Sequence, residues 1–135
     1  HINRNTMTAA CVFLLATIVL HLLRLVAVRR VTISHTKQMA FCALSEKPVG
    51  IDAEPLDRSL DLRLADKILS PSERIFYDAA QDKQQTLLRF WVLKEALAKL
   101  TGRGVGNWLK NTDFDPYDEK ITCIDGCYVA VLEEE

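Results

Sequence analysis

Two carboxylates, with one residue between them, lie at the end of a short apolar segment. Asp52 and Glu54 are spaced i and i+2, so in a strand both would project from the same face. One interpretation is a strand end whose polar side chains face solvent, and the pair by itself favours it. The other is a site for a hard cation, because Mg²⁺ takes a few carboxylate oxygens together with substrate phosphates.

A second charged pair, Glu95 and Lys99, is spaced i and i+4 in a segment with helical periodicity, one turn after Trp91. In isolation such a pair is typical of a helix surface, where it contributes about 0.2–0.5 kcal/mol. The functional alternative adds a third carboxylate to the cation site and an ammonium beside the phosphates. Gly102 and Gly104, which follow, fit a helix end and a turn, or a loop whose backbone approaches a ligand closely.

Taken together and in this order, these patterns resemble the paired signature of the phosphopantetheinyl transferases. That signature is a G-I-D-x-E strand followed by a W-x-x-K-E-x-x-x-K-x-x-G-x-G helix, and the chain matches it at residues 49–54 and 90–104. Residues 34–36, Ser-His-Thr, resemble the S-H-S/T element of the larger, surfactin-synthetase-type members. The chain resembles the C-terminal half of those members.

The resemblance implies roles for the charged residues of the two motifs. Asp52, Glu54 and Glu95 match the acids that hold Mg²⁺ against the diphosphate of coenzyme A, and Mn²⁺ is a possible substitute because it also accepts oxygen ligands. Glu95 is also the candidate general base for the carrier serine. Lys99 matches the lysine that lies on the phosphates and stabilises the transferred group.

Three further residues are placed by the same resemblance. His35 matches a histidine that contacts the 3′-phosphate of coenzyme A, and Lys94 is expected to be another phosphate or carrier contact. Glu73 stands where some members have another acid near the metal. A capping box that begins at Ser70 already explains Glu73, so its catalytic role ranks low.

The activity that the resemblance implies is Mg²⁺-dependent transfer of the 4′-phosphopantetheine arm of coenzyme A to a serine of an acyl or peptidyl carrier protein. Adenosine 3′,5′-bisphosphate leaves, and the setting is fatty acid, polyketide or nonribosomal peptide biosynthesis. The alternative is a truncated, non-catalytic module that binds coenzyme A or the carrier protein. Because larger members bind coenzyme A between two similar halves, this chain is either a partial form or completes its site as a homo-oligomer.

The composition agrees with a globular enzyme and excludes some other classes. The 135 residues suffice for one core, and a net charge of −1 argues against nucleic-acid binding, which needs a basic surplus. None of the four cysteines forms a C-x-x-C pair. Cys123 and Cys127 would be diagonal rather than directly opposite neighbours in a hairpin, which disfavours a disulfide between them. Reduced thiols and a cytoplasmic location are therefore expected.

The N-terminal segment, residues 9–28, is the one part that the family does not explain. Its uninterrupted apolar stretch, residues 9–20, is shorter than the about 20 residues that a membrane span needs. Thr17, His21 and Arg24 fall on one helical stripe, which favours a core helix over a membrane anchor, an interfacial helix, a signal segment or an expression artefact. Residues 1–30 are therefore separated from a transferase-like domain over residues 31–135, and no membrane partner is expected.

The expected fold is α+β, with an antiparallel sheet packed against a long helix. Strands are predicted over residues 39–44 and 49–54, paired as a hairpin across a four-residue turn. A second hairpin is predicted over residues 120–132, because Asp125-Gly126 is a strong two-residue turn signal.

Helices are predicted over the middle of the chain. Apolar residues at helical spacing predict one over residues 60–69. Ser70, Pro71 and Glu73 predict the start of another, with serine as N-cap and proline in the first helical position. The longest is predicted over residues 83–101 and ends at Gly102, a residue suited to the left-handed conformation there.

Overall fold

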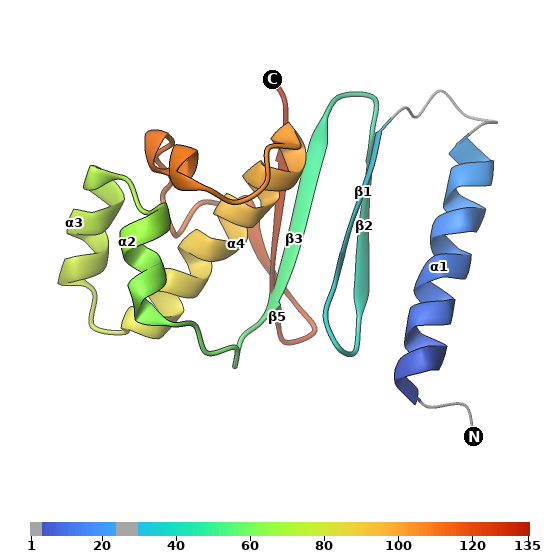
Figure 1. Cartoon of the computed structure of the whole chain (residues 1–135), viewed down its shortest axis with the longest axis horizontal. Helices are drawn as coiled ribbons and strands as arrows, with labels where there is room; N and C mark the ends of the chain where they lie inside the picture. Colours follow the sequence, from blue (N-terminus) through green and yellow to red (C-terminus); the bar gives the residue numbers. More distant parts are fainter. Residues whose placement is uncertain (1–3, 24–29) are drawn as a thin grey trace.

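The computed structural model of the chain describes residues 4–23 and 30–135. Its central sheet has three antiparallel strands in the order β3 (Val49–Pro55), β5 (Cys127–Glu133) and β4 (Ile121–Ile124). With helices packed on this sheet, the α+β architecture that the sequence predicts is confirmed (Figure 1).

The hairpin formed by β4 and β5 is the one that the Asp125-Gly126 signal predicts. Ile124 pairs with Cys127 across the two turn residues. Asp125 and Gly126 have φ angles of 47° and 77°, which a two-residue turn of type I′ requires. Residues 120–132 therefore fold locally, as the sequence indicates.

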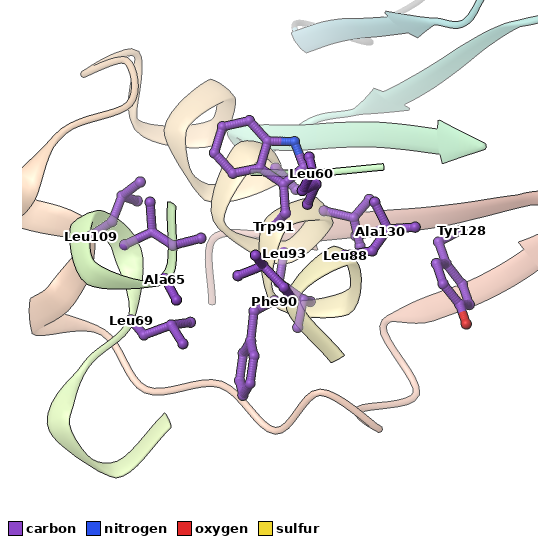
Figure 2. Close-up of a cluster of buried hydrophobic side chains, with 14 of the residues drawn as sticks. Leu60, Ala65, Leu69, Leu88, Phe90, Trp91, Leu93, Leu109, Tyr128 and Ala130 are labelled. Carbon is purple, nitrogen blue, oxygen red and sulfur yellow. The ribbon is translucent and has the colours of Figure 1, made fainter. Parts of the chain in front are cut away.

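The long helix α4 (Lys83–Thr101) packs on one face of the central sheet and has the predicted bounds. The Asp82 side chain caps its start by accepting from the Gln85 N–H at 3.0 Å, and Gly102 ends it at a φ of 70°. Its apolar side chains meet β5 in the main core, which Figure 2 shows around Leu88, Phe90, Trp91, Leu93, Tyr128 and Ala130.

Gly50 allows α4 to lie unusually close to β3. A Cβ at this position would stand 2.0 Å from the Ala96 carbonyl oxygen and 2.7 Å from the Leu100 nitrogen, both backbone atoms. Only a residue without a side chain fits there. The glycine of the G-I-D-x-E motif thus sets the separation between the strand and the helix that carry the candidate site.

The other helices that follow β3 are short and cover the other side of α4 (Figure 1). They are η1 (Leu62–Leu64), α2 (Ala65–Ile68), α3 (Pro71–Ala79) and η2 (Asn107–Asn111). The predicted helix over residues 60–69 is therefore shorter than expected. The Gln84 side-chain amide takes both the N–H and the carbonyl of Leu60, at 3.0 and 2.8 Å, and holds that residue outside the helix.

The first two strands, β1 (Arg30–His35) and β2 (Ala40–Ser45), form an antiparallel hairpin of their own. The predicted pairing of residues 39–44 with 49–54 is therefore wrong. β3 pairs along its whole length with β5, and the hairpin packs against this pair through Met39, Phe41 and Ala43. Because β5 comes from the far end of the chain, the local sequence around β3 could not show that β5 would pair with it in place of residues 39–44.

Helix α1 (Arg4–Leu23) forms an outer layer beyond the β1–β2 hairpin (Figure 1). Phe13 is 77% exposed and Leu14 is 63% exposed, whereas Val12, Ala16 and Val19 face the β1–β2 hairpin across a small cavity. One face of α1 is therefore uncovered, and its interpretation as a core helix stays a prediction. Thr17 donates to the Phe13 carbonyl at 2.8 Å, a bond within the helix itself, and Arg24 lies outside the described residues. Within residues 4–23 and 30–135, no helix is long and apolar enough to span a membrane.

Candidate functional site

The two acids of β3 project toward α4 and are buried. Asp52 and Glu54 are each 5% exposed, whereas Ile51 and Ala53, which alternate with them, pack toward the β1–β2 hairpin. The interpretation as a solvent-facing strand end is therefore wrong. Because burying a carboxylate is costly unless it is paired, the partners of these two acids determine what the site can do.

Glu54 has a partner for each carboxylate oxygen. Its Oε1 accepts from the Trp91 Nε1–H at 3.0 Å, and its Oε2 forms an ion pair with the Arg58 guanidinium. Arg58 also lies over the Trp91 ring, with its Cζ 6.0 Å from the ring centroid. Trp91 is thus a neutral, buried partner of Glu54, whereas Arg58 is a charged and partly exposed one.

Asp52 is only half satisfied. Its Oδ1 accepts from Lys99 Nζ at 2.8 Å and from Ser34 Oγ at 3.1 Å, but its Oδ2 is buried without a partner. Burial raises the pKa of Asp52 to about 6; Lys99 opposes this rise, and the charges of Glu54 and Glu95 add to it. In the described part of the chain, Oδ2 is the one buried side-chain polar atom left unpaired.

Glu95 is the third acid, and it approaches from α4. Its side chain is half-buried, and burial raises its pKa, with Lys99 and Arg58 opposing the rise and Glu54 adding to it. Glu95 therefore lies within electrostatic reach of the other two acids. We call Asp52, Glu54 and Glu95, with Arg58 and Lys99, the acid cluster.

The donor set of the acid cluster suits a hard divalent cation. Carboxylate oxygens are the ligands that Mg²⁺ prefers, and a cation would give the unpaired Asp52 Oδ2 its missing partner. However, Arg58 forms an ion pair with Glu54, and Lys99 forms one with Asp52. Within residues 4–23 and 30–135, no three acids, histidines or cysteines are arranged to hold a metal ion. The residues fit the ion by chemistry, and Arg58 must move for Glu54 to coordinate it.

An open cleft of about 1150 Å³ lies beside the cluster. Asp52, Glu54 and Lys99 line it, together with His35 from the end of β1. This volume suits a ligand somewhat larger than a typical drug. The structure thus brings four of the predicted site residues to one cleft, with Glu95 near them but outside its lining.

The cleft also contains residues that the sequence did not single out for the site. Arg58, Lys37 and Asp57 line it, and Ser34, part of the Ser-His-Thr element, bonds to Asp52. Arg58 is four residues after Glu54, a spacing that places side chains together in a helix but carries no such meaning after a strand. Only the turn that follows β3 brings Arg58 back to Glu54.

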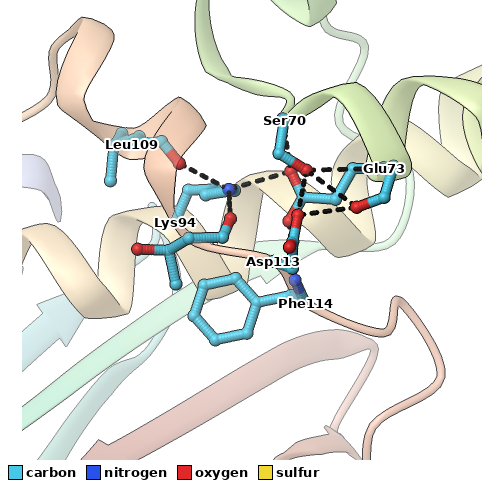
Figure 3. Close-up of polar contacts among 8 residues, drawn as sticks. Ser70, Glu73, Lys94, Leu109, Asp113 and Phe114 are labelled. Atoms are coloured by element: carbon cyan, nitrogen blue, oxygen red, sulfur yellow. Dashed lines mark hydrogen bonds and ion pairs between the residues drawn. The ribbon is translucent and has the colours of Figure 1, made fainter.

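Lys94 has a structural role, which corrects the prediction of a phosphate or carrier contact. Its side chain is 0% exposed, and its ammonium contacts Glu73 Oε2 at 2.8 Å and the carbonyls of Leu109 and Thr112 at 2.7 and 2.5 Å (Figure 3). All three protons are therefore used inside the protein. Burial lowers the pKa of Lys94, and the Glu73 carboxylate opposes that shift.

Glu73 is equally enclosed, which confirms the capping box. Its Oε2 accepts from the Ser70 N–H at 2.9 Å and its Oε1 from the Phe114 N–H at 2.8 Å (Figure 3). The pair formed by Glu73 and Lys94 joins α3 and α4 to the segment after η2. Neither residue faces the cleft, since both side chains are buried and absent from its lining.

Comparison with known proteins assigns the chain to a family. Residues 48–124 match the model of the 4′-phosphopantetheinyl transferase superfamily. The chain is 33% identical over 75 residues to the 4′-phosphopantetheinyl transferase gsp of Aneurinibacillus migulanus, and 36% identical over 77 residues to HetI of a Nostoc species. Each alignment covers 54% of this chain, and 31% and 32% of the respective relative, so the chain spans about a third of their length.

A solved structure supports the same fold. The holo-[acyl-carrier-protein] synthase of Thermotoga maritima superposes with a TM-score of 0.50 at 22% identity, covering 62% of this chain and 60% of that one. At this identity the likeness concerns the fold alone. Because the family model covers more than half of the 135 residues and includes both motifs, the chain belongs to the 4′-phosphopantetheinyl transferase superfamily.

Proposed function

We propose that this protein transfers the 4′-phosphopantetheine arm of coenzyme A to a serine of an acyl or peptidyl carrier protein and releases adenosine 3′,5′-bisphosphate. Family membership and the names of the relatives support this reaction class. The observation that carries the proposal is the unpaired, buried Oδ2 of Asp52 among three acids beside a cleft. The proposed location is the cytoplasm, in line with the cysteine pattern.

In this proposal Asp52, Glu54 and Glu95 hold Mg²⁺, with Mn²⁺ as a substitute. The ion, when bound, supplies positive charge against the diphosphate of coenzyme A. Asp52 contributes the oxygen that lacks a partner, and Trp91 keeps Glu54 oriented through the Nε1–H bond. Burial raises the pKa of Asp52, so a cation bound beside it would favour its ionised form.

Glu95 and Lys99 act on the reacting groups. Burial raises the pKa of Glu95, which makes this carboxylate a better proton acceptor for the carrier serine hydroxyl than an exposed glutamate. The Lys99 side chain is 31% exposed and borders the cleft, so it can turn from Asp52 to a phosphate oxygen. Its ammonium would then offset charge that develops on the transferred group.

His35 is proposed to contact the 3′-phosphate of coenzyme A. It lies at the end of β1 on the rim of the cleft and is exposed, so an anionic ligand can reach its ring. Lys37, two residues further on, lines the same rim. Together they give the cleft two nitrogen-bearing side chains besides those of the acid cluster.

A non-catalytic module that binds coenzyme A or a carrier protein is the second candidate function. It is favoured by the pairing of Arg58 and Lys99 with the acids, which neutralises both without any metal. Under the first candidate function, the site would be completed in a homo-oligomer, because the chain aligns with only about a third of the length of its relatives.

Intact-mass spectrometry of apo carrier proteins, incubated with this protein, coenzyme A and Mg²⁺, tests the proposal. A phosphopantetheine-sized mass gain that a chelator abolishes is expected, together with its loss in Glu95→Gln and its retention in the exposed control Glu119→Gln. Steep loss on dilution would support a site shared between chains. Coenzyme A binding without any mass gain would favour the binding module and contradict transfer.

A further inference from the structure

Arg58 occupies an unusual position between the acid cluster and the cleft. It follows β3 in a turn closed by the bond from its own N–H to the Pro55 carbonyl at 3.0 Å. From this turn the side chain returns to Glu54 Oε2 and the Trp91 ring, yet it is 42% exposed and lines the cleft. The guanidinium therefore contacts a buried acid on one side and solvent on the other.

The two partners of Glu54 differ in how easily they can leave. Trp91 is buried in the core and is fixed by packing, so its bond to Oε1 stays. Arg58 is held by one ion pair and a loose ring contact, and its side chain is 42% exposed, so water can solvate the guanidinium when it leaves Oε2. Oε2 is thus the oxygen of Glu54 that can change partner.

We propose that Arg58 is an exchangeable counter-ion: it holds Glu54 while no metal is bound, gives up Oε2 to a divalent cation, and then binds the phosphates of the ligand. This inference rests on the proposed cation site. Two cations cannot share one carboxylate oxygen without strong repulsion. The turn at Pro55 keeps the displaced guanidinium at the cleft, where its planar fork suits phosphate oxygens.

The exchange predicts effects of opposite sign for Arg58→Met. Without a phosphate ligand, the variant should bind Mn²⁺ about fivefold or more tightly, because the guanidinium no longer competes with the ion for Glu54 Oε2. With Mg²⁺ present, it should bind inorganic pyrophosphate, a diphosphate probe, several-fold more weakly. A defect in folding would weaken both, so the opposed signs separate exchange from damage.

The experiment titrates Mn²⁺ into wild type, Arg58→Met and a matched control, Arg63→Met, and follows free Mn²⁺ by electron paramagnetic resonance. Arg63 is an exposed arginine paired with Asp61, and its removal should leave the affinity unchanged. Pyrophosphate binding is measured by calorimetry in the same three proteins. Tighter Mn²⁺ binding and weaker pyrophosphate binding in Arg58→Met alone would support the exchange.

Two other results would overturn it, and they differ in what else they affect. If wild type binds Mn²⁺, Asp52→Asn abolishes that binding, and Arg58→Met changes nothing, the cation site stands and the exchange is wrong. If neither wild type nor Arg58→Met binds Mn²⁺, the proposed cation site and the exchange both fail.

Discussion

Helix α4 contributes to two charged clusters that differ in how completely their atoms are paired. Around Lys94 and Glu73, both side chains are at most 1% exposed, and each ammonium proton and carboxylate oxygen has a protein partner. In the acid cluster, Asp52 Oδ2 has none, and Arg58 and Lys99 are partly exposed. Residues adjacent in sequence, Lys94 and Glu95, belong to different clusters.

The difference separates a structural ion pair from a candidate binding site. A saturated, enclosed pair gains nothing from a ligand and fixes the segments that it joins. A cluster with an orphaned oxygen and raised acid pKa values is stabilised by a cation, and such perturbed groups beside a cleft are typical of functional sites. Burial alone does not make this distinction, since both clusters contain buried charges.

The largest effect is expected from breaking the saturated pair. Lys94→Met leaves the Glu73 carboxylate buried without its counter-charge, which should lower the free energy of unfolding by about 3–5 kcal/mol. Urea denaturation followed by circular dichroism measures this. Lys110→Met, at a less buried lysine of η2, is the control and should change stability by at most about 0.5 kcal/mol. A loss below about 1 kcal/mol in Lys94→Met would contradict the structural role.

The acid cluster should make the free energy of unfolding depend on pH. Burial raises the pKa of Asp52 to about 6 in the folded protein, so the folded state binds the proton more tightly than the unfolded state does. Stability should therefore fall by up to about 3 kcal/mol as pH rises from about 4 to above 6. Denaturation at several pH values should show this slope in wild type.

Asp52→Asn provides the comparison for that slope. Because asparagine does not titrate, the variant should lack this part of the pH dependence, and Mg²⁺ should reduce the loss in wild type only. Equal slopes in the two proteins would mean that Asp52 is not the group whose ionisation opposes folding.

Filling the narrow space between α4 and β3 with a side chain should have a smaller effect on stability. Gly50→Ala places a methyl group against the Ala96 and Leu100 backbone, and overpacking of this kind costs about 1–3 kcal/mol. Thermal unfolding measures the loss, and Mn²⁺ titration of the folded variant should show weaker binding because Asp52 and Glu95 are forced apart. Gly106→Ala controls for the loss of a glycine away from this contact, because Gly106 has an extended φ of −172° and a Cβ there would meet only the Trp108 side chain, at 3.3 Å.

The smallest effect is expected from Trp91→Phe. It keeps the aromatic packing but removes the Nε1–H bond to Glu54, which should cost about 1–2 kcal/mol of stability. Chemical denaturation measures this loss. Trp108→Phe removes the bond to the Gly104 carbonyl at an exposed loop and should cost less. If the two variants lose equal stability, the buried bond to Glu54 does not contribute more than the exposed one.

The elements that sequence predicted well are those defined by local signals. The bounds of α4 follow from its capping residues and Gly102, and the β4–β5 hairpin from Asp125-Gly126. The pairing of β1 with β2 was missed because β3 takes its partner from the other end of the chain. The exposure of one face of α1 was missed because apolar composition predicts burial without showing what is available to cover a helix.

The candidate site divides in the same way. The three acids and Lys99 are found from motif spacing, and the structure brings them together at one end of β3 and α4. Lys94 was assigned to ligand binding through the family resemblance, but it adjoins Glu95 on α4, and one residue along a helix turns a side chain by about 100°. That rotation carries Lys94 to Glu73. Arg58 was missed because a turn, rather than a spacing rule, positions it.

The most direct test of the difference between the two clusters is calorimetric titration of Mg²⁺ into wild type, Asp52→Asn and Glu73→Gln, each shown to be folded by circular dichroism. If the acid cluster is the cation site, wild type and Glu73→Gln bind the ion alike and Asp52→Asn does not bind it. Binding that survives Asp52→Asn but is lost in Glu73→Gln would contradict that assignment and place the ion at the enclosed pair instead.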